Sequence, residues 1–222
     1  MAVCRIMQVR RKKKIGRGLW LSAVLLIKRF EGKLKERIKY MKIRVSGIVE
    51  ESIVDGPGIR YTIFTQGCNH DCKGCHNPDT HDFAGGSIKE CSSIVNEFKE
   101  NFLLDGITLS GGEPFLQPTE CTLLAQEARK IGLNVVTYTG YTFEELYLKA
   151  ERSKEIMELL RNTDILVDGP FIQEQRNILL KFRGSENQRI IDVKKTLNKY
   201  KRVEENEGKN VNDILLYEFE EE

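Results

Sequence analysis

Short β-rich runs alternate with helical patterns along most of this chain, and this alternation is what most constrains its fold. The β-rich runs are residues 60–67, 106–110, 134–140 and 164–169. Strands separated by helices pair in parallel, because the helix carries the chain back to the start of the next strand. The 157 residues from Met41 to Leu197 fall short of the roughly 250 residues of a closed eight-unit barrel. The sequence therefore predicts an α/β fold, a partial and open (β/α) barrel.

Capping residues indicate where the helices begin and end. Ser87 and Thr142 are each followed three residues later by a glutamate, which predicts two capping boxes, and the second helix is expected to reach about Arg161. A further helix is expected to begin at Pro118 and to stop at Gly132. In the helix expected from Ser87, the buried positions are Ile94, Val95, Phe98 and Phe102. In the helix expected from Pro118, they are Leu123, Leu124, Ala128 and Ile131.

Charge is unevenly distributed along the sequence, although the formal net charge is only +2. Residues 1–40 contain 13 Lys/Arg and 2 Asp/Glu, which leaves 22 and 31 for the rest. A mildly acidic body argues against a nucleic-acid surface, and the nine-residue apolar run 19–27 is too short for a membrane span of about 20 residues. We expect a cytoplasmic protein with a basic leader, 1–40, that is untranslated or disordered, a domain over 41–197 and a charged tail over 198–222.

Three of the six cysteines lie close together, at Cys68, Cys72 and Cys75, with the spacing C-x3-C-x2-C. Without a convincing export signal, clustered thiols indicate metal binding, whereas Cys91 and Cys121 are expected to be small buried residues. A structural zinc site needs four protein ligands, and a nearby histidine would supply the fourth. Three thiolates on an iron–sulfur cube would instead leave one iron open to an outside ligand.

Each predicted strand is followed by a polar or glycine-rich loop. Cys68 follows the first strand, residues 110–113 the second, residues 139–141 the third and residues 168–170 the fourth. The carboxyl ends of parallel strands lie along one edge of a sheet, where ligands bind. In "SGGEP" the glycines would let the backbone approach a ligand closely, and the glutamate would add an anionic acceptor.

The cysteine spacing, followed after the next strand by "SGGEP", resembles the radical S-adenosylmethionine enzymes. "VDGPGIRYTIFTQGC", "CHNPDTHDF" and "LSGGEPF" resemble the activases of glycyl radical enzymes. "TYTGYTFEEL", "DILVDGPF" and "KFRGSENQRIID" are similar to the activating proteins of anaerobic ribonucleoside-triphosphate reductase, and the pyruvate formate-lyase activating enzyme is the alternative. The resemblance covers Met41 to about Lys194. A zinc-stabilised binding module without catalysis is the alternative from another class.

The resemblance implies a radical SAM oxidoreductase that reductively cleaves S-adenosylmethionine at a [4Fe-4S] cluster held by Cys68, Cys72 and Cys75. The 5′-deoxyadenosyl radical would take a hydrogen atom from a glycine of the large reductase chain, with an electron from flavodoxin or ferredoxin. No catalytic side chain is expected beyond the cluster ligands. The residues that the resemblance places at the cofactor are Gly74, Cys75, His76, Gly111, Gly112, Glu113, Thr139 and Asp168.

Four other polar residues have two interpretations each. His70 and His81 are interpreted as solvated loop residues, with metal ligation as the alternative. Arg60, after "GPG", is either an anion-binding residue or a structural one. Arg183 either contacts the cofactor or the partner, or makes a solvated ion pair of little energetic weight.

Overall fold

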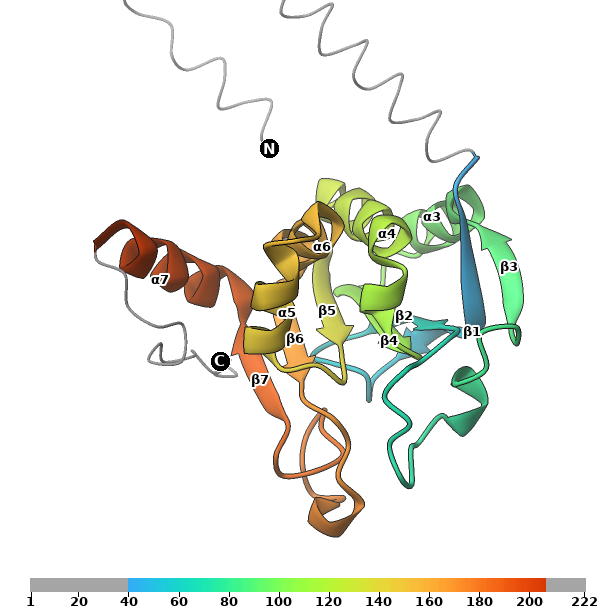
Figure 1. The fold of residues 1–222 in the computed structure, drawn as a ribbon. Helices are drawn as coiled ribbons and strands as arrows, with labels where there is room; N and C mark the ends of the chain where they lie inside the picture. Colours follow the sequence, from blue (N-terminus) through green and yellow to red (C-terminus); the bar gives the residue numbers. More distant parts are fainter. Residues whose placement is uncertain (1–39, 207–222) are drawn as a thin grey trace, which may run out of the picture. The chain divides into compact units, whose positions relative to one another are not determined.

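The computed structural model of the protein describes residues 40–206, shown in colour in Figure 1. The expectations for the leader fall on residues outside the described part, apart from Tyr40, and so does the tail beyond residue 206.

A seven-stranded sheet forms the centre of the described part, in the order β3-β1-β2-β4-β5-β6-β7. Its strands are β1 Lys42–Ser52, β2 Arg60–Thr65, β3 Ser87–Glu90, β4 Gly106–Gly111, β5 Asn134–Tyr138, β6 Ile165–Asp168 and β7 Arg189–Asp192. The four central strands β2, β4, β5 and β6 are parallel, and the outer three pair antiparallel to their neighbours. The edge strands β3 and β7 do not meet, so the sheet is open. The α/β class and the open arrangement are confirmed.

Helices follow the parallel strands and cover the sheet from one side. They are α3 Cys91–Glu100, α4 Pro118–Lys130, α5 Phe143–Ala150, α6 Lys154–Asn162 and α7 Val193–Asn206, with short 3-10 turns η1 Pro78–Thr80, η2 Pro114–Leu116 and η3 Gln173–Gln175. In Figure 1 the loops after β2 and β6 extend together, away from these helices. Residues 60, 106, 134 and 165 begin the parallel strands, so they mark the amino edge of the sheet, and the loops with the predicted site residues mark its carboxyl edge.

The hydrophobic core lies between the central strands and the helices. The strands are buried on both faces, which explains their near-continuous apolar sequences. Fully buried members include Ile63, Ile107, Leu109, Val135 and Leu166 from strands, and Ile94, Phe98, Leu124, Leu146 and Leu160 from helices. Cys91 and Cys121 are also fully buried, as predicted.

The capping box predicted at Ser87 is wrong. Residues Ser87–Glu90 form β3, which pairs antiparallel with the start of β1, and the helix begins only at Cys91. Pairing with a strand that was not predicted from the sequence thus outweighs a local capping signal. Phe102 is 95% exposed and Ile131 is 46% exposed, so neither belongs to the core. The stop at Gly132 is confirmed, with a positive φ of 91°.

The helix expected from Thr142 to Arg161 is two helices. Thr142 and Glu145 make the predicted capping box at the start of α5, which ends at Ala150. A new helix then begins after Ser153, whose side chain accepts a hydrogen bond from the N–H of Ile156. The strands β1 and β7 were not predicted.

The last helix extends the domain beyond the predicted boundary at residue 197. Tyr200 of α7 is fully buried. Its ring centroid lies 5.2 Å from that of Phe143 and 4.6 Å from that of Tyr147. Because α7 packs on α5 through these rings, residues 198–200 belong to the folded domain and not to a solvated tail.

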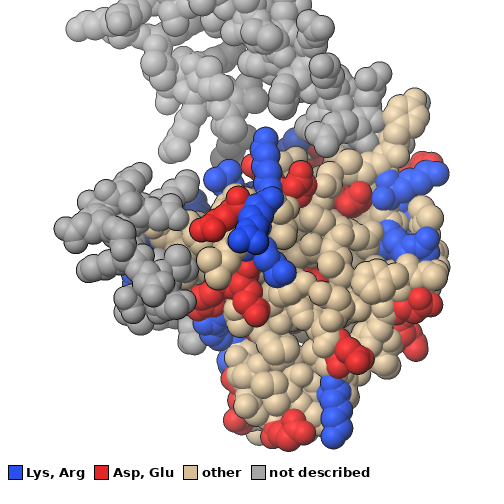
Figure 2. Space-filling view, in the orientation of Figure 1, with Lys and Arg blue, Asp and Glu red and all other residues tan. Residues whose placement is uncertain are grey.

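On the face shown in Figure 2, acidic and basic side chains are interspersed. None of the helices in residues 40–206 combines the length and the apolar composition needed to cross a bilayer.

Candidate functional site

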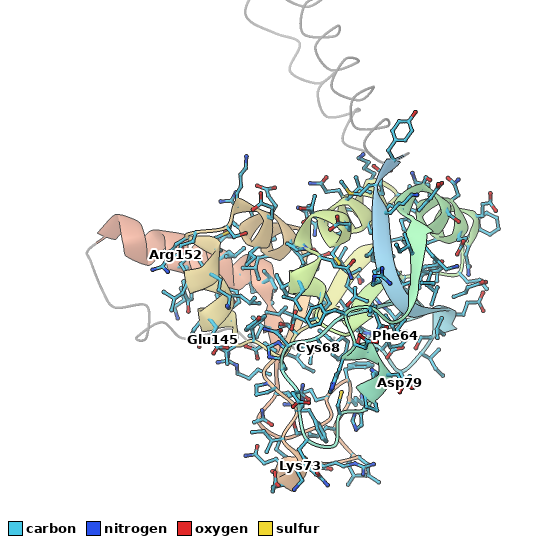
Figure 3. All side chains as sticks on the ribbon, turned by 45° about the vertical axis from the view of Figure 1, so that its right-hand side comes forward. Phe64, Cys68, Lys73, Asp79, Glu145 and Arg152 are labelled. Carbon is cyan, nitrogen blue, oxygen red and sulfur yellow. The ribbon has the colours of Figure 1, made fainter. Side chains whose placement is uncertain are left out.

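The three clustered cysteines lie on the loop that follows β2, residues 67–77, here called the cysteine loop. In Figure 3, Cys68 lies near the end of β2 and Lys73 lies at the tip of the loop. Gly67 begins the loop with a φ of 95°, and its N–H donates to the carbonyl of Thr80 at 2.8 Å. All three cysteines are free and half-buried, so their sulfur atoms are available to a ligand.

Each of the three sulfur atoms accepts a hydrogen bond from a backbone N–H. The donor to Cys68 is the amide of His70 and the donor to Cys72 is the amide of Phe171. The amide of Asn77 lies 3.4 Å from the sulfur of Cys75. Such donors stabilise thiolate sulfur and are one of the means by which proteins tune iron–sulfur clusters.

Burial raises the pKa of Cys68 and that of Cys72, and repulsion from the neighbouring thiolates raises them further. Three neighbouring thiolates repel one another, so they need a positive partner. In residues 40–206, no three His, Cys, Asp or Glu side chains converge on a point where one metal ion would sit. A structural zinc site needs four protein ligands, whereas a [4Fe-4S] cube held by three thiolates keeps one iron open. The three thiols of the cysteine loop are the donor set of the second kind of site.

The glycine turn, residues 111–113, is fastened to the start of the cysteine loop by its backbone. The N–H of Gly112 donates to the carbonyl of Thr65 at 2.7 Å, and that of Glu113 donates to the carbonyl of Gly67 at 2.9 Å. A Cβ at Gly112 would lie 2.3 Å from the carbonyl oxygen of Gly67, and Gly111 has a φ of 92°. Both positions need glycine because two backbone segments touch here.

The carboxylate of Glu113 is fully buried and surrounded by donors. It accepts from the N–H of Phe115 at 3.0 Å, the N–H of Gly140 at 3.0 Å and the hydroxyl of Thr139 at 3.0 and 3.1 Å. Nε2 of His70 lies 2.7 Å from Oε2. The expectation that Glu113 offers an anionic acceptor to the cofactor stays a prediction, and protein donors already surround the carboxylate.

His70 was interpreted as a solvated loop residue, and this interpretation is wrong. Its side chain is 13% exposed, and its ring lies edge-on to that of Tyr141 with the centroids 4.3 Å apart. The amide of Asn69 donates to the hydroxyl of Tyr141 at 2.8 Å. The side chain of His81 is 25% exposed and its Nδ1 lies 3.7 Å from Asp71, so it is not freely solvated either.

The loop after β6, residues 169–188, supports the cysteine loop from its other side. The ring centroids of His76 and Phe171 are 4.8 Å apart. Gly74 has a φ of 75°, and a Cβ there would lie 3.0 Å from Gln173. His76 remains exposed and Thr139 is 6% exposed. Within the cysteine loop, Gly74 and His76 thus contact the loop after β6, whereas Gly67 contacts the glycine turn.

Asp168 ends β6 as predicted, but its fully buried carboxylate is already engaged. Arg189 donates to it through Nε at 3.0 Å and Nη2 at 2.5 Å, and the N–H of Phe143 donates at 2.7 Å. Arg189 also pairs with Glu144 at 2.7 Å. Burial raises the pKa of Asp168, and Arg189 offsets part of that rise. Asp168 thus holds β7 and the start of α5 together, and its contact with a ribose stays a prediction.

Both arginines with open interpretations are structural. Arg60 is fully buried at the amino edge, where it donates to the hydroxyl of Thr108 at 3.1 Å and to the carbonyl of Ile107 at 2.5 Å. Burial lowers its pKa to about 10. Arg183 donates to the carbonyl of Gln188 at 3.0 Å, and its Nε is buried.

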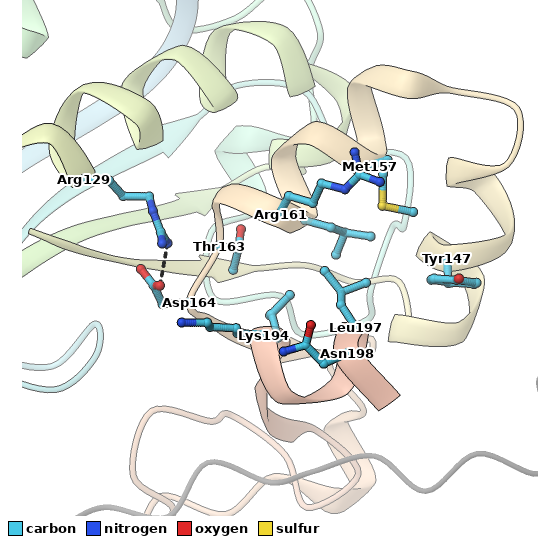
Figure 4. A pocket seen from close by; sticks show the side chains of 11 residues that line it. Arg129, Tyr147, Met157, Arg161, Thr163, Asp164, Lys194, Leu197 and Asn198 are labelled. Atoms are coloured by element: carbon cyan, nitrogen blue, oxygen red, sulfur yellow. Dashed lines mark hydrogen bonds and ion pairs between the residues drawn. The ribbon is translucent and has the colours of Figure 1, made fainter. Parts of the chain in front are cut away.

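A cavity of about 420 Å³ lies at the amino edge, away from the cysteines. In Figure 4 the side chains of Arg129 and Asp164 pair across it, 2.5 Å apart. It contains none of the predicted site residues. Its lining residues are Arg129, Tyr147, Met157, Leu160, Arg161, Thr163, Asp164, Val193, Lys194, Leu197 and Asn198.

Sequence reasoning placed Tyr141 at the carboxyl edge, but it missed the roles of His70, Phe171 and Arg189. Phe171 directly follows the expected loop 168–170. Extending that loop by one residue would have found it. Nothing in the local sequence indicates the contact of His70 with Glu113 or that of Arg189 with Asp168.

Residues 54–191 match the family model described as a 4Fe-4S single cluster domain. The chain is 35% identical over 147 residues to the anaerobic ribonucleoside-triphosphate reductase-activating protein of Haemophilus influenzae, covering 62% of this chain and 90% of the relative. The protein of the same name from Escherichia coli K12 is 34% identical over 145 residues, covering 61% and 90%. That of Enterobacteria phage T4 is 31% identical over 149 residues, covering 62% and 86%. The crystal structure of QueE from Escherichia coli aligns at a TM-score of 0.35 and 15% identity, over 49% of this chain and 57% of that chain.

Proposed function

The chain belongs to the family of anaerobic ribonucleoside-triphosphate reductase-activating proteins, and from this we propose that it cleaves S-adenosylmethionine at a [4Fe-4S] cluster to make a glycyl radical on that reductase. The observation that carries the proposal is the cysteine loop, in which three half-buried sulfur atoms each accept a backbone N–H. When bound, such a cluster supplies one electron to S-adenosylmethionine at its fourth iron, which yields methionine and a 5′-deoxyadenosyl radical that takes a hydrogen atom from glycine.

Cys68, Cys72 and Cys75 would hold the cluster as thiolates. Burial, and then repulsion from neighbouring thiolates, raises the pKa values of Cys68 and Cys72, so iron binding must displace their protons. The backbone donors then stabilise the sulfur charge without adding a titrating group. This supports a site in which the protein supplies position and hydrogen bonds, and no side-chain acid or base.

The cofactor would lie between the cysteine loop and the loops that follow β4 and β5. The residues proposed to contact it are Gly74, Cys75, His76, Gly111, Gly112, Glu113, Thr139 and Asp168. Glu113 and Asp168 are proposed also to orient these loops, because both carboxylates are fully buried and bonded to them. The loops on both sides of the cysteine loop would limit the access of water to the reacting carbon.

The partners follow from the same proposal. The named relatives favour the reductase over pyruvate formate-lyase as the protein that receives the radical. A low-potential flavodoxin or ferredoxin would supply the electron.

Anaerobic reconstitution with iron and sulfide tests the proposal. We expect a brown protein with about four irons per chain, and, after reduction and addition of S-adenosylmethionine, a glycyl radical doublet by electron paramagnetic resonance when the reductase is present. A colourless protein with one zinc would support the non-catalytic alternative. A doublet with pyruvate formate-lyase alone would show that the partner is wrong.

A further inference from the structure

Loops from three strands meet at one contact between two side chains. His70 of the cysteine loop places Nε2 2.7 Å from Oε2 of Glu113, which follows β4. The same carboxylate accepts from the hydroxyl of Thr139 and the N–H of Gly140, both after β5. Glu113 is fully buried and the side chain of His70 is 13% exposed. The contact is therefore enclosed and joins all three loops.

The imidazole of His70 is fixed from three directions. Glu113 holds its Nε2, and Tyr141 packs edge-on with ring centroids 4.3 Å apart. On the third side, a Cβ at Gly140 would lie 2.5 Å from the ring, so only glycine fits there. Asn69 adds a hydrogen bond of 2.8 Å to the hydroxyl of Tyr141. A ring held in this way has one orientation.

The position of the pair in the chain gives it a function beyond packing. His70 lies between Cys68 and Cys72, and its own N–H donates to the sulfur of Cys68. Glu113 is the last residue of the glycine turn, and its N–H is bonded to the first residue of the cysteine loop, Gly67. The pair thus connects the segment that carries the thiols to the turn that faces them.

We propose that His70 and Glu113 are positioning residues that fix the cysteine loop against the glycine turn and thereby set the geometry in which S-adenosylmethionine binds. This rests on the proposed function, because it assumes that the cofactor lies between these two segments. The carboxylate orients the histidine, and the histidine orients the loop. Residues that orient metal ligands in this way typically change affinity by about 10- to 100-fold when they are replaced.

The test compares His70→Ala with His70→Gln in the full chain, and uses His81→Gln as the matched control. Alanine removes the hydrogen bond to Glu113 and the ring against Tyr141. Glutamine keeps an N–H that reaches the carboxylate, so it is the conservative variant. His81 is a histidine of the neighbouring segment whose side chain does not contact Glu113, so its replacement controls for the loss of any histidine near the cysteines.

Two readouts do not depend on activity. In the iron-free protein, trypsin cleavage after the exposed Lys73 reports how firmly the cysteine loop is held, and we expect His70→Ala to be cleaved about tenfold faster. In the reconstituted protein, equilibrium dialysis gives the dissociation constant of S-adenosylmethionine and chemical analysis gives iron per chain. We expect at least tenfold weaker binding for His70→Ala at unchanged iron content, and recovery to within about threefold for His70→Gln.

Spectroscopy separates positioning from simple loss of stability. The reduced wild-type cluster should change its electron paramagnetic resonance spectrum when S-adenosylmethionine is added, and His70→Ala should lose most of that change at saturating cofactor. Unchanged cofactor affinity and an unchanged spectral response in His70→Ala would overturn the inference. Iron loss that accounts for all of the lost binding would also overturn it, because the pair would then serve only assembly. Wild type that binds iron but no S-adenosylmethionine would refute the proposed function instead, and the inference with it.

Discussion

Arg60 at the amino edge of the parallel sheet and Glu113 at its carboxyl edge are both completely buried charged side chains, and they are satisfied in opposite ways. Arg60 at the amino edge donates to the hydroxyl of Thr108 and to carbonyls of the strands and turn around it. Glu113 at the carboxyl edge accepts from loops that follow three different strands. The partners of Arg60 therefore lie mainly in the strands. The partners of Glu113 lie in loops, which its carboxylate holds together.

This difference indicates how stability and chemistry are separated in the fold. A buried charge whose partners are backbone and hydroxyl groups of the framework holds strands together. A buried charge whose partners lie on several loops fixes the positions of those loops relative to one another. Replacements at the amino edge should therefore change the free energy of unfolding, and replacements at the carboxyl edge should change cofactor binding.

The largest expected effect is that of removing a thiol from the carboxyl edge. Cys72→Ala should leave less than a full cluster and abolish glycyl radical formation, because two thiolates do not hold a cube whose fourth iron is open. Iron analysis and electron paramagnetic resonance measure this. Cys91→Ala is the control, since Cys91 is fully buried in the core and its loss should leave iron content unchanged. Full radical yield in Cys72→Ala would show that the thiols are not the ligands.

At the amino edge, Arg60→Met should lower the free energy of unfolding by about 3–5 kcal/mol, because carbonyl groups that Arg60 satisfies would be left buried without a donor. Denaturant titration of the iron-free protein measures the change. The folded fraction should still bind S-adenosylmethionine with wild-type affinity after reconstitution. Weakened binding with little loss of stability would contradict the division between the two edges.

The glycine turn offers an intermediate effect at the carboxyl edge. Gly112→Ala places a Cβ against the carbonyl oxygen of Gly67, so the turn and the cysteine loop must separate. We expect cofactor affinity to fall about tenfold or more, and the free energy of unfolding to fall by about 1–3 kcal/mol. Gly47→Ala is the control, because nothing lies within 4 Å of a Cβ there. Equal cofactor affinity in the two variants would show that the close approach does not matter for binding.

The smallest effect is expected at Tyr200, which packs on α5 away from the cysteines. Its hydroxyl is buried without a partner, so Tyr200→Phe should change the free energy of unfolding by less than about 1 kcal/mol at pH 7. Burial raises the pKa of Tyr200 to about 12. The unfolded chain releases this proton near pH 10, so the wild type should lose stability between pH 10 and 12.

Denaturant titrations at pH 8 and pH 11 measure that loss. Tyr200→Phe should lose less stability over this interval than the wild type does, because phenylalanine has no proton to release. An equal loss in both proteins would show that Tyr200 does not contribute to the alkaline slope.

Periodic features of this fold could be predicted from the sequence. The four parallel strands and α4 follow from apolar runs and capping residues, and the convergence of their loops follows from parallel topology. Antiparallel pairing could not be predicted in the same way. β3 carries a helix-start signal and becomes a strand only because β1 lies beside it. The break between α5 and α6 depends on one side chain, Ser153, that caps the second helix.

The site shows the same limit. Cys68, Cys72, Cys75 and the glycine turn are recognisable because their residue types and spacing carry the chemistry directly. The burial of Glu113 is not recognisable, because a carboxylate in a glycine-rich loop is equally compatible with solvent or ligand. Only the fold brings His70 to it. Contacts between loops are long-range, and local sequence does not encode them.

The most direct test of the account follows one hydrogen atom. The reconstituted activator is incubated with S-adenosylmethionine, a reductant and reductase that carries deuterium on its glycine α-carbons, and the 5′-deoxyadenosine formed is analysed by mass spectrometry. The account predicts deuterium in 5′-deoxyadenosine, formed together with the glycyl radical. A glycyl radical without labelled 5′-deoxyadenosine would contradict it, and so would an iron-loaded protein that binds the cofactor and never cleaves it.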